Sequence, residues 1–262
     1  ARRRTRRARV EIEAIAVTAL RERWRGVHED SALDELAAAV LAGESDPYRA
    51  AAGDYQTTFR FGGHRWFYPR GYLLPSGRIL CITRCQRDPT GVMWSEVFHS
   101  DDGGDTWGFL SRINDFGAPG NLVVMPDGRI VVAVTEKMCD SPGHTLLFGS
   151  EDDGRTWSLL GRANDIGEPA HLLALRDGRL ALTYGFPLPP YRLAARLSED
   201  GGRSWSDERI LREGGGSPDL GSARSIQRDD GDIVTVYQWN DAGETGAFYG
   251  GRRYLAAAVW RP

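Results

Sequence analysis

The chain has 262 residues, a formal net charge of −3 and 41% apolar residues, which is the composition of an ordinary soluble globular protein and excludes a disordered tail protein. Its apolar runs are short and broken by Gly, Pro, Asp or Arg, so we expect no membrane span, which needs ~18 to 20 such residues. The three cysteines lack paired spacing and predict neither a disulfide framework nor a zinc site.

Residues 1–55 are expected to form an arginine-rich arm followed by a partly helical segment. Six of the first nine residues are arginine, so the rest of the chain carries a charge of −9. An acidic body argues against nucleic-acid binding, because phosphate recognition needs a basic face on the folded part. We therefore expect the arm to be a solvated chain end, with a polyanion-binding arm as the alternative.

Two local patterns describe the rest of this N-terminal segment. Ser31 and Asp34 resemble a capping box, and leucines at helical spacing follow, which predicts a helix over 32–42. Glu11 and Glu13 lie where an export signal needs an apolar core, so no signal peptide is recognisable and the compartment stays open.

Residues 56–262 contain an internal repeat of about 50 residues. The motif SxDxGx[ST]W occurs three times, and a turn followed by an apolar strand occurs four times in phase with it. The first motif ends at Trp107, Trp157 and Trp205, and the second is centred on Gly77, Gly128, Gly178 and Gly231. Two motifs that recur at one interval define four copies of one unit, at about 60–110, 111–160, 161–210 and 211–262.

Each repeat is expected to form about four short β-strands, because its turn residues separate short runs of Val, Ile, Leu and Tyr. That length and strand number are typical of a propeller blade. Within SxDxGx[ST]W, the aspartate is expected to accept hydrogen bonds from turn amides, and the tryptophan to pack between strands. The predicted fold is therefore an all-β propeller whose Asp-containing turns are structural.

The three motifs are similar to the Asp boxes of BNR-repeat proteins, and the stretch Leu197–Asp241 resembles bacterial sialidases (neuraminidases). The resemblance covers about 60–262. It implies a six-bladed propeller and an exo-α-sialidase-like glycoside hydrolase that cleaves terminal sialic acid or a related anionic sugar. Because about four blades are visible, we expect truncation before Ala1. The alternatives are that residues 1–55 replace the other blades or that a partner chain completes the propeller.

One position of the repeat carries a different polar residue in each copy. Seven residues before the repeat glycine lie Arg70, Asn121, His171 and Arg224. Each blade of a ligand pocket contacts a different ligand atom, so variation at a fixed place predicts that these side chains converge on one ligand. The alternative is that they are hydrogen-bonded strand ends near solvent.

The resemblance implies that three arginines clamp the carboxylate of sialic acid, since a guanidinium offers two parallel donors. Arg70 and Arg224 are expected members by register, and Arg192 by its place before the last blade. A surface ion pair is the alternative for each. The corresponding place in the second repeat, near His144, has no arginine.

The resemblance also implies a tyrosine nucleophile, which sialidases use in place of a carboxylate. Its expected place, nine residues before the glycine of the last repeat, holds Ser222. Tyr237, at the far end of the same strand, is the expected substitute, and Tyr68, nine residues before the first repeat glycine, is the other. Each is alternatively a structural residue.

Glu168 is the expected general base, with Glu136 second, and Asp88 is the expected acid. Nucleotide, metalloprotease and serine-hydrolase motifs do not occur in the sequence, so we expect no cofactor or metal. Three functions remain open: a sialidase-type hydrolase, a glycan-binding propeller that has lost catalysis, which Ser222 favours, and a protein-interaction propeller.

Overall fold

The computed structural model describes residues 65–86, 92–136, 142–243 and 252–262. The chain divides into two units, Ala1–Thr58 and Phe59–Pro262, and the described residues belong to the second. The predicted arm, the 32–42 helix and Asp88 lie outside them. Within the described ranges, the chain has no helix that is long and apolar enough to cross a membrane.

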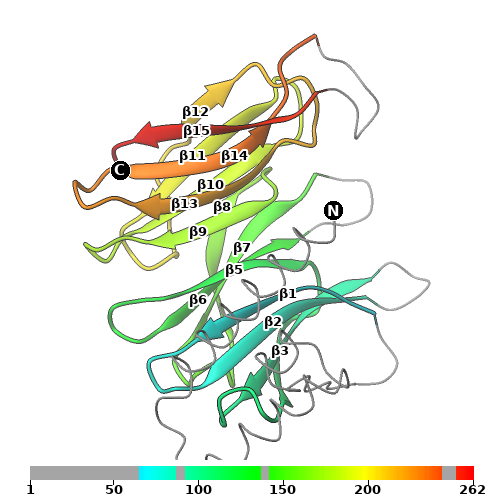
Figure 1. Cartoon of the computed structure of the whole chain (residues 1–262), viewed down its shortest axis with the longest axis vertical. Helices are drawn as coiled ribbons and strands as arrows, with labels where there is room; N and C mark the ends of the chain where they lie inside the picture. The colour runs from blue at the N-terminus through cyan, green and yellow to red at the C-terminus, as the bar shows by residue number, and fades with distance from the viewer. Residues whose placement is uncertain (1–64, 87–91, 137–141, 244–251) are drawn as a thin grey trace, which may run out of the picture. The chain divides into compact units, whose positions relative to one another are not determined.

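The described chain is all-β and forms four antiparallel sheets, which we call blades 1 to 4 (Figure 1). Blade 1 contains β1 (Arg65–Leu73), β2 (Ile79–Gln86), β3 (Met93–Ser100) and β4 (Gly108–Asn114). Blade 2 contains β5 (Ala118–Val124), β6 (Ile130–Glu136), β7 (His144–Ser150) and β8 (Ser158–Asn164). Blade 3 contains β9 (Ala170–Ala174), β10 (Leu180–Phe186), β11 (Arg192–Ser198) and β12 (Arg209–Glu213). Blade 4 contains β13 (Gly221–Gln227), β14 (Ile233–Trp239) and β15 (Tyr254–Trp260). This confirms the predicted all-β arrangement of four blades.

The turn between the first two strands of each blade has one geometry. In blade 1 the amide of Gly77 donates to the carbonyl of Leu74 at 2.9 Å, and the amide of Leu74 donates to the carbonyl of Arg78 at 2.8 Å. Gly77 has φ +88°, and Gly231 in blade 4 has φ +89°, a region that an L-residue enters only with strain. The recurring glycine therefore closes each innermost hairpin.

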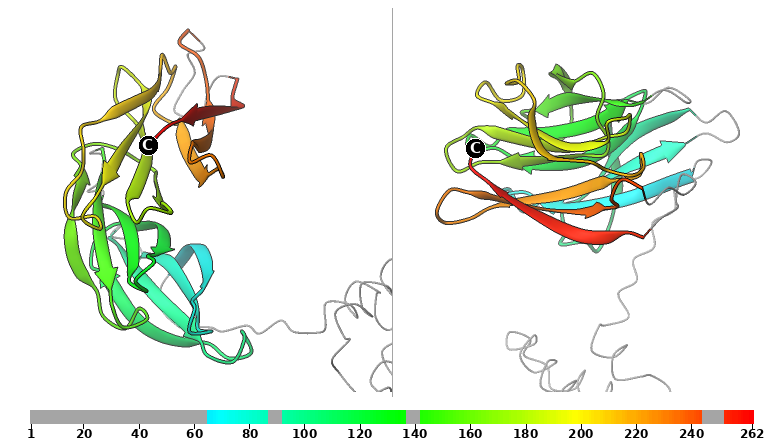
Figure 2. Two further views of the ribbon diagram at one scale, coloured as in Figure 1. Left: turned by 90° about the vertical axis from the view of Figure 1, so that its left-hand side faces the viewer. Right: turned by 90° about the horizontal axis from the view of Figure 1, so that it is seen from above.

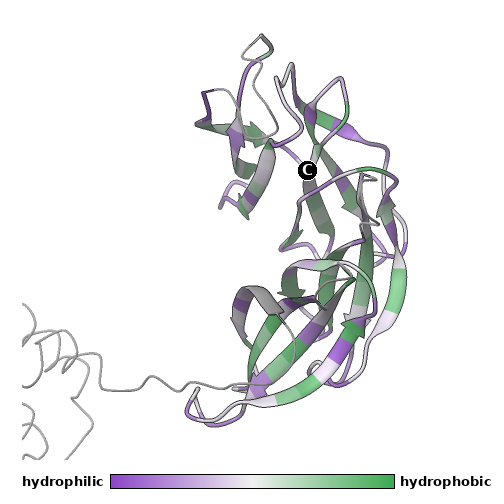
Figure 3. Cartoon of the chain, turned by 90° about the vertical axis from the view of Figure 1, so that its right-hand side faces the viewer, coloured by the Kyte–Doolittle hydropathy of each residue, from purple (hydrophilic) through white to green (hydrophobic). Residues whose placement is uncertain are grey.

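The blades follow one another around a curve, with the innermost strands β1, β5, β9 and β13 in succession (Figure 2). Apolar residues lie mainly on the strands, and hydrophilic residues lie mainly at the turns (Figure 3). Buried clusters join neighbouring blades: Leu80 and Ile82 of blade 1 pack with Val132 and Val134 of blade 2. The faces between blades are therefore the core of this unit, which explains the apolar run in the second strand of each blade.

Blade 4 presents an apolar face that its counterparts in other blades bury. Val236 lies five residues after its repeat glycine, as Ile82 and Ala133 do in blades 1 and 2. Ile82 and Ala133 are fully buried, whereas Val236 is 44% exposed. Leu255 and Val259 on β15 are also exposed. The described residues of blade 4 thus have a covered face toward blade 3 and an open face on the other side.

Candidate functional site

The SxDxGx[ST]W turns connect the third and fourth strands of blades 1 to 3. In blade 3, Ser198 Oγ donates to Asp200 Oδ1 at 2.9 Å and accepts from the amide of Gly202 at 2.8 Å. Asp200 also accepts from the amide of Ser204 at 2.9 Å. The bonds from Ser204 and Ser198 lower the pKa of Asp200 to about 2. Its carboxylate is used to hold the turn together.

Trp157 and Trp205 attach their blades to the preceding ones. Trp157 Nε1 donates to Ser111 Oγ of blade 1 at 3.0 Å, and Ser111 Oγ donates to the carbonyl of Gly154 at 2.6 Å. Trp157 packs against the cluster between blades 1 and 2, and Trp205 packs against the cluster between blades 2 and 3. The turns therefore hold the propeller together at separate places, as a folding device would.

Three of the four innermost strands have an irregular backbone where they begin. β1, β5 and β13 each contain a register irregularity there, between Phe67 and Arg70, between Pro119 and Leu122, and between Gly221 and Arg224. A bulge of this kind redirects side chains. Tyr68 and Ser222 occupy the same repeat position inside two of these bulges, with φ +55° and +45°. Left-handed backbone at non-glycine residues is costly and gathers at functional sites, so these positions indicate one.

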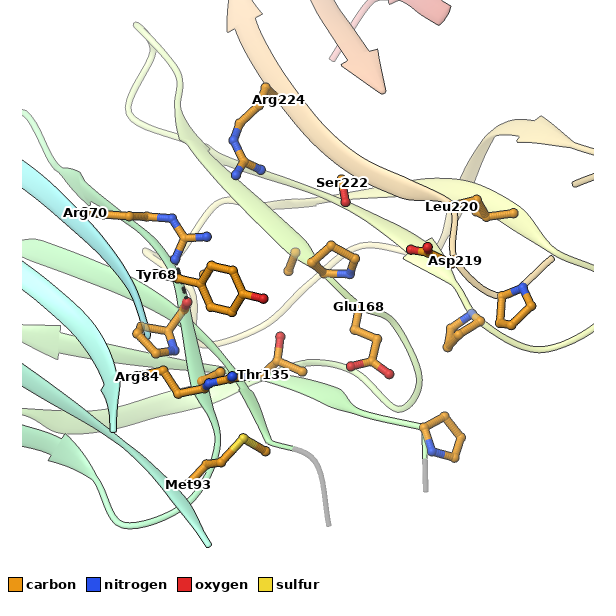
Figure 4. A pocket seen from close by; sticks show the side chains of 18 of the residues that line it. Tyr68, Arg70, Arg84, Met93, Thr135, Glu168, Asp219, Leu220, Ser222 and Arg224 are labelled. Carbon is orange, nitrogen blue, oxygen red and sulfur yellow. Dashed lines mark hydrogen bonds between the residues drawn. The ribbon is translucent and has the colours of Figure 1, made fainter. Parts of the chain in front are cut away.

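A cavity of about 640 Å³ lies at these strand starts, and all four blades contribute to it (Figure 4). Blade 1 supplies Tyr68, Arg70 and Arg84, and blade 4 supplies Ser222 and Arg224. The cavity is large enough for a monosaccharide with a substituent. The bulges and the cavity thus coincide.

Three arginines lie on one side of the cavity. Arg70 Nη1 donates to the carbonyl of Pro119 at 2.9 Å, and the guanidinium of Arg84 lies 5.1 Å from the centre of the Tyr68 ring. Burial lowers the pKa of Arg70; Tyr72 opposes this effect, and Arg224 lowers the pKa further. The influence of Arg224 means that two cations from blades 1 and 4 are near each other, which favours an anion between them.

Asn121 and His171 share the repeat position of Arg70 and Arg224 but join neighbouring strands instead of lining the cavity. Asn121 Nδ2 donates to the carbonyl of Leu172 at 2.7 Å, and the amide of Leu172 donates to Asn121 Oδ1 at 2.7 Å. The amide of Ser225 donates to His171 Nδ1 at 3.3 Å. Burial, followed by Arg224 and Arg70, lowers the pKa of His171 to about 4. A neutral imidazole suits its role as an acceptor.

Arg192 and Tyr237 lie away from the cavity residues. Arg192 Nε forms a 2.7 Å ion pair with Glu208 Oε1, and its guanidinium stacks 3.6 Å from the Phe186 ring centre. Tyr237 is 4% exposed and packs edge-on against Trp239. Among the sequence-predicted residues, the structure brings Arg70, Arg224 and Glu168 together at the cavity, and Tyr68 and Ser222 with them.

Glycines hold Glu168 in the cavity wall. Its amide donates to the carbonyl of Gly185 at 2.9 Å, and its Oε1 accepts from the amide of Gly143 at 3.5 Å. A Cβ on Gly143 would lie 2.7 Å from Thr135 Cγ2 and 3.1 Å from Glu168 Oε2, so only glycine permits this approach. Glu136, the second choice as base, instead pairs with His144 at 3.0 Å.

The sequence analysis did not predict three of the polar cavity residues: Arg84, Thr135 and Asp219. Asp219 pairs with Arg253 at 2.7 Å. A signal for the first two is present, because Arg84 and Thr135 both lie seven residues after the repeat glycine, a place that varies between copies as the position seven residues before it does. The described residues contain no group of three His, Cys, Asp or Glu side chains that would hold a metal ion.

A scan of protein-family models finds no match, and a search of curated proteins finds no relative. Solved structures are similar to the chain. A protein of unknown function from Dyadobacter fermentans is 24% identical with a TM-score of 0.61, and covers 73% of this chain and 52% of its own. A GH93 α-L-arabinofuranosidase of Fusarium graminearum, solved with arabinobiose, is 17% identical with a TM-score of 0.61, over 77% and 65%.

A Hadza microbial sialidase is 18% identical with a TM-score of 0.56, over 78% of this chain and 44% of the sialidase. At these identities the likeness establishes the propeller fold alone. The chain spans 52% of the length of the Dyadobacter fermentans protein, 65% of the arabinofuranosidase and 44% of the sialidase. Membership in the BNR-repeat family stays a prediction.

Proposed function

We propose that this chain is a carbohydrate-active propeller that binds an acidic sugar, sialic acid or a related one, in the cavity between the blades. The observation that carries the proposal is that Arg70, Arg84 and Arg224 line one cavity of monosaccharide size. Guanidinium groups recognise carboxylates through paired N–H donors, and Arg is the preferred residue for this task. Asn121 and His171 then join the inner strands from outside the cavity.

The strength of such binding follows from the number of charged hydrogen bonds. Each bond between a guanidinium and a carboxylate contributes about 1.5 to 3 kcal/mol when its loss leaves a charged group unpaired. Removal of Arg224 should therefore weaken binding about 10-fold to 100-fold. The positive charges of Arg70 and Arg224 repel each other in the free protein, and an anionic ligand bound between them would offset that repulsion.

We propose further that the cavity hydrolyses a glycosidic bond, with Tyr68 as the nucleophile and Glu168 as its general base. Tyr68 is 65% exposed, and Figure 4 shows its ring directed into the cavity on the side that faces Glu168. Glu168 would take the phenolic proton as the tyrosine oxygen attacks the anomeric carbon, and the bond from that carbon to the aglycone oxygen would break, with solvent protonating the leaving oxygen. Water would then displace the tyrosine from the anomeric carbon, which releases the sugar and returns the proton to the tyrosine. Tyr68 thus takes the place that sequence reasoning gave to Tyr237, which is buried.

The solved structures support this class of function. One neighbour is an α-L-arabinofuranosidase bound to arabinobiose and another is a sialidase, so the fold carries glycoside hydrolases that act on different sugars. The arginines, and not the fold, are the argument for an acidic sugar.

A second function, binding without hydrolysis, is favoured by Ser222. This residue occupies the tyrosine's place in blade 4 and lines the cavity. A serine hydroxyl is a weak nucleophile without a base placed to activate it. Under this alternative, the arginines retain their role, and Tyr68 only contacts the sugar.

Paired measurements separate these outcomes: sialic acid binding by calorimetry, and hydrolysis of an aryl sialoside. We expect wild-type protein to bind and hydrolyse, Arg224→Ala to lose affinity, and Tyr68→Phe to bind normally but lose hydrolysis. Arg162→Ala, which removes a surface partner of Asp165, is the control. Equal affinity in wild type and Arg224→Ala would remove Arg224 from the site. Binding without hydrolysis in wild type would establish the second function.

A further inference from the structure

The cavity wall around Glu168 contains four prolines and a leucine beside its two carboxylates, and it is poor in hydrogen-bond donors. Pro169 follows Glu168 directly, and Pro142 precedes Gly143, whose amide donates to the Glu168 carboxylate. Pro187 and Leu188 follow β10 and line the same cavity, as does Pro218. Proline has no backbone N–H, so this wall offers a ligand few donors. It contrasts with the opposite side, where the arginines gather.

This asymmetry gives the cavity two chemically different ends. Figure 4 shows Arg70, Arg84 and Tyr68 on one side and Glu168 and Asp219 on the other. Asp219 is held by Arg253 at 2.7 Å and by Gln238 Nε2 at 3.3 Å, so its carboxylate already has partners. A hydroxylated group placed against the proline and leucine side chains, and not against Glu168 or Asp219, would lose hydrogen bonds to water without replacement, whereas an apolar group would gain by leaving water.

The exposure of Leu188 supports the same interpretation. Leu188 is 38% exposed in the free protein, although it lies among prolines beside a cavity. A partly exposed apolar side chain that lines a cavity offers contact area to a ligand, because part of its surface is still accessible to water.

We propose that the proline and leucine wall is a subsite for an apolar leaving group, so that the preferred substrate is an acidic glycoside whose aglycone is aryl or alkyl. The proposal rests on the proposed function, because it assumes that the arginines hold the sugar carboxylate and that Glu168 lies beside the bond to be cleaved. The aglycone then extends from the anomeric carbon over Leu188 and the neighbouring prolines.

The test uses two thioglycosides of sialic acid, which resist hydrolysis, one with a 4-nitrophenyl group and one with a methyl group. Calorimetry should show at least 10-fold tighter binding of the aryl compound to wild-type protein. Leu188→Asn should reduce that preference several-fold and leave binding of the methyl compound unchanged. Leu159→Asn, which alters a leucine that is 61% exposed on β8, is the matched control and should behave as wild type.

Equal binding of the two compounds by wild type would overturn the subsite while leaving the arginine site in place. An aryl preference that survives Leu188→Asn and also Pro187→Ser would likewise overturn it. Failure of both compounds to bind would overturn the proposed function and the subsite together. Thermal unfolding of each variant checks that the fold is retained.

Discussion

The outer turns and the inner strand starts of the same repeat have opposite patterns of variation. The SxDxGx[ST]W turns repeat the same side-chain bonds in blades 1 to 3: Ser100, Ser150 and Ser198 each donate to the aspartate two residues later. The strand starts hold Tyr68, Pro119, Pro169 and Ser222 at one shared position. The difference indicates that a position with the same residue in every repeat serves the fold, whereas a position that varies between repeats is free to serve a ligand.

The largest effect should come from the outer region. Trp157→Ala removes an aromatic side chain that joins blades 1 and 2, and we expect the free energy of unfolding to fall by about 3 to 5 kcal/mol. Urea unfolding measures it. Phe116→Ala, at an exposed aromatic residue, should stay within about 0.5 kcal/mol of wild type. Comparable losses in both variants would show that the turn tryptophan has no special role.

The second prediction tests an exception within the inner region. Asn121→Ala removes both bonds to the backbone of buried Leu172, and each unpaired group costs about 1 to 3 kcal/mol, so we expect a loss of about 2 to 6 kcal/mol. Sugar affinity of the folded variant should be unchanged. A variant as stable as wild type but unable to bind sugar would place Asn121 with the ligand instead.

The third prediction separates the two regions by pH. The pKa of His171 is lowered from 6.5 to about 4, so its contribution to stability is present above pH 6.5 and is lost as pH falls toward 4. Partial burial raises the pKa of Asp152, but hydrogen bonds from Thr156 and Ser150 outweigh this effect and lower it to about 2. The pKa of Asp200 is likewise lowered to about 2. Their contributions are present above about pH 4 and are lost between pH 4 and pH 2.

Urea unfolding at pH values from 7 to 2 measures both windows. His171→Gln should flatten the dependence between pH 6.5 and 4 and leave the lower window, whereas Asp200→Asn should weaken the lower window alone. A wild-type stability that is constant from pH 7 to pH 4 would contradict the assignment for His171.

The fold was predictable from the sequence because the residues that recur in each repeat are structural: glycines that close turns and tryptophans that pack between blades. Gly77 and Gly231, which lie at equivalent places of the repeat, occupy equivalent turns of blades 1 and 4 in the structure. A local pattern that recurs four times leaves few arrangements of strands.

The candidate site was predictable only in part. Register predicted that Arg70, Arg224 and Asn121 share one place, and the two arginines line the cavity, whereas the Asn121 side chain bonds to the next strand. Whether a side chain at that position enters the cavity depends on the local bulge and on its length, and periodicity contains neither. Arg84 was missed because it lies on β2, seven residues past the turn, and reaches the cavity only through the pairing of β2 with β1.

The central claim is that the arginines of the inner strand starts bind the carboxylate of a sugar. The most direct measurement is calorimetric titration of wild-type protein with the methyl α-glycoside of sialic acid and with its methyl ester, which differ in that one negative charge. We expect the acid to bind at least 10-fold more tightly than the ester. Equal affinities, or no binding of the acid, would contradict the account.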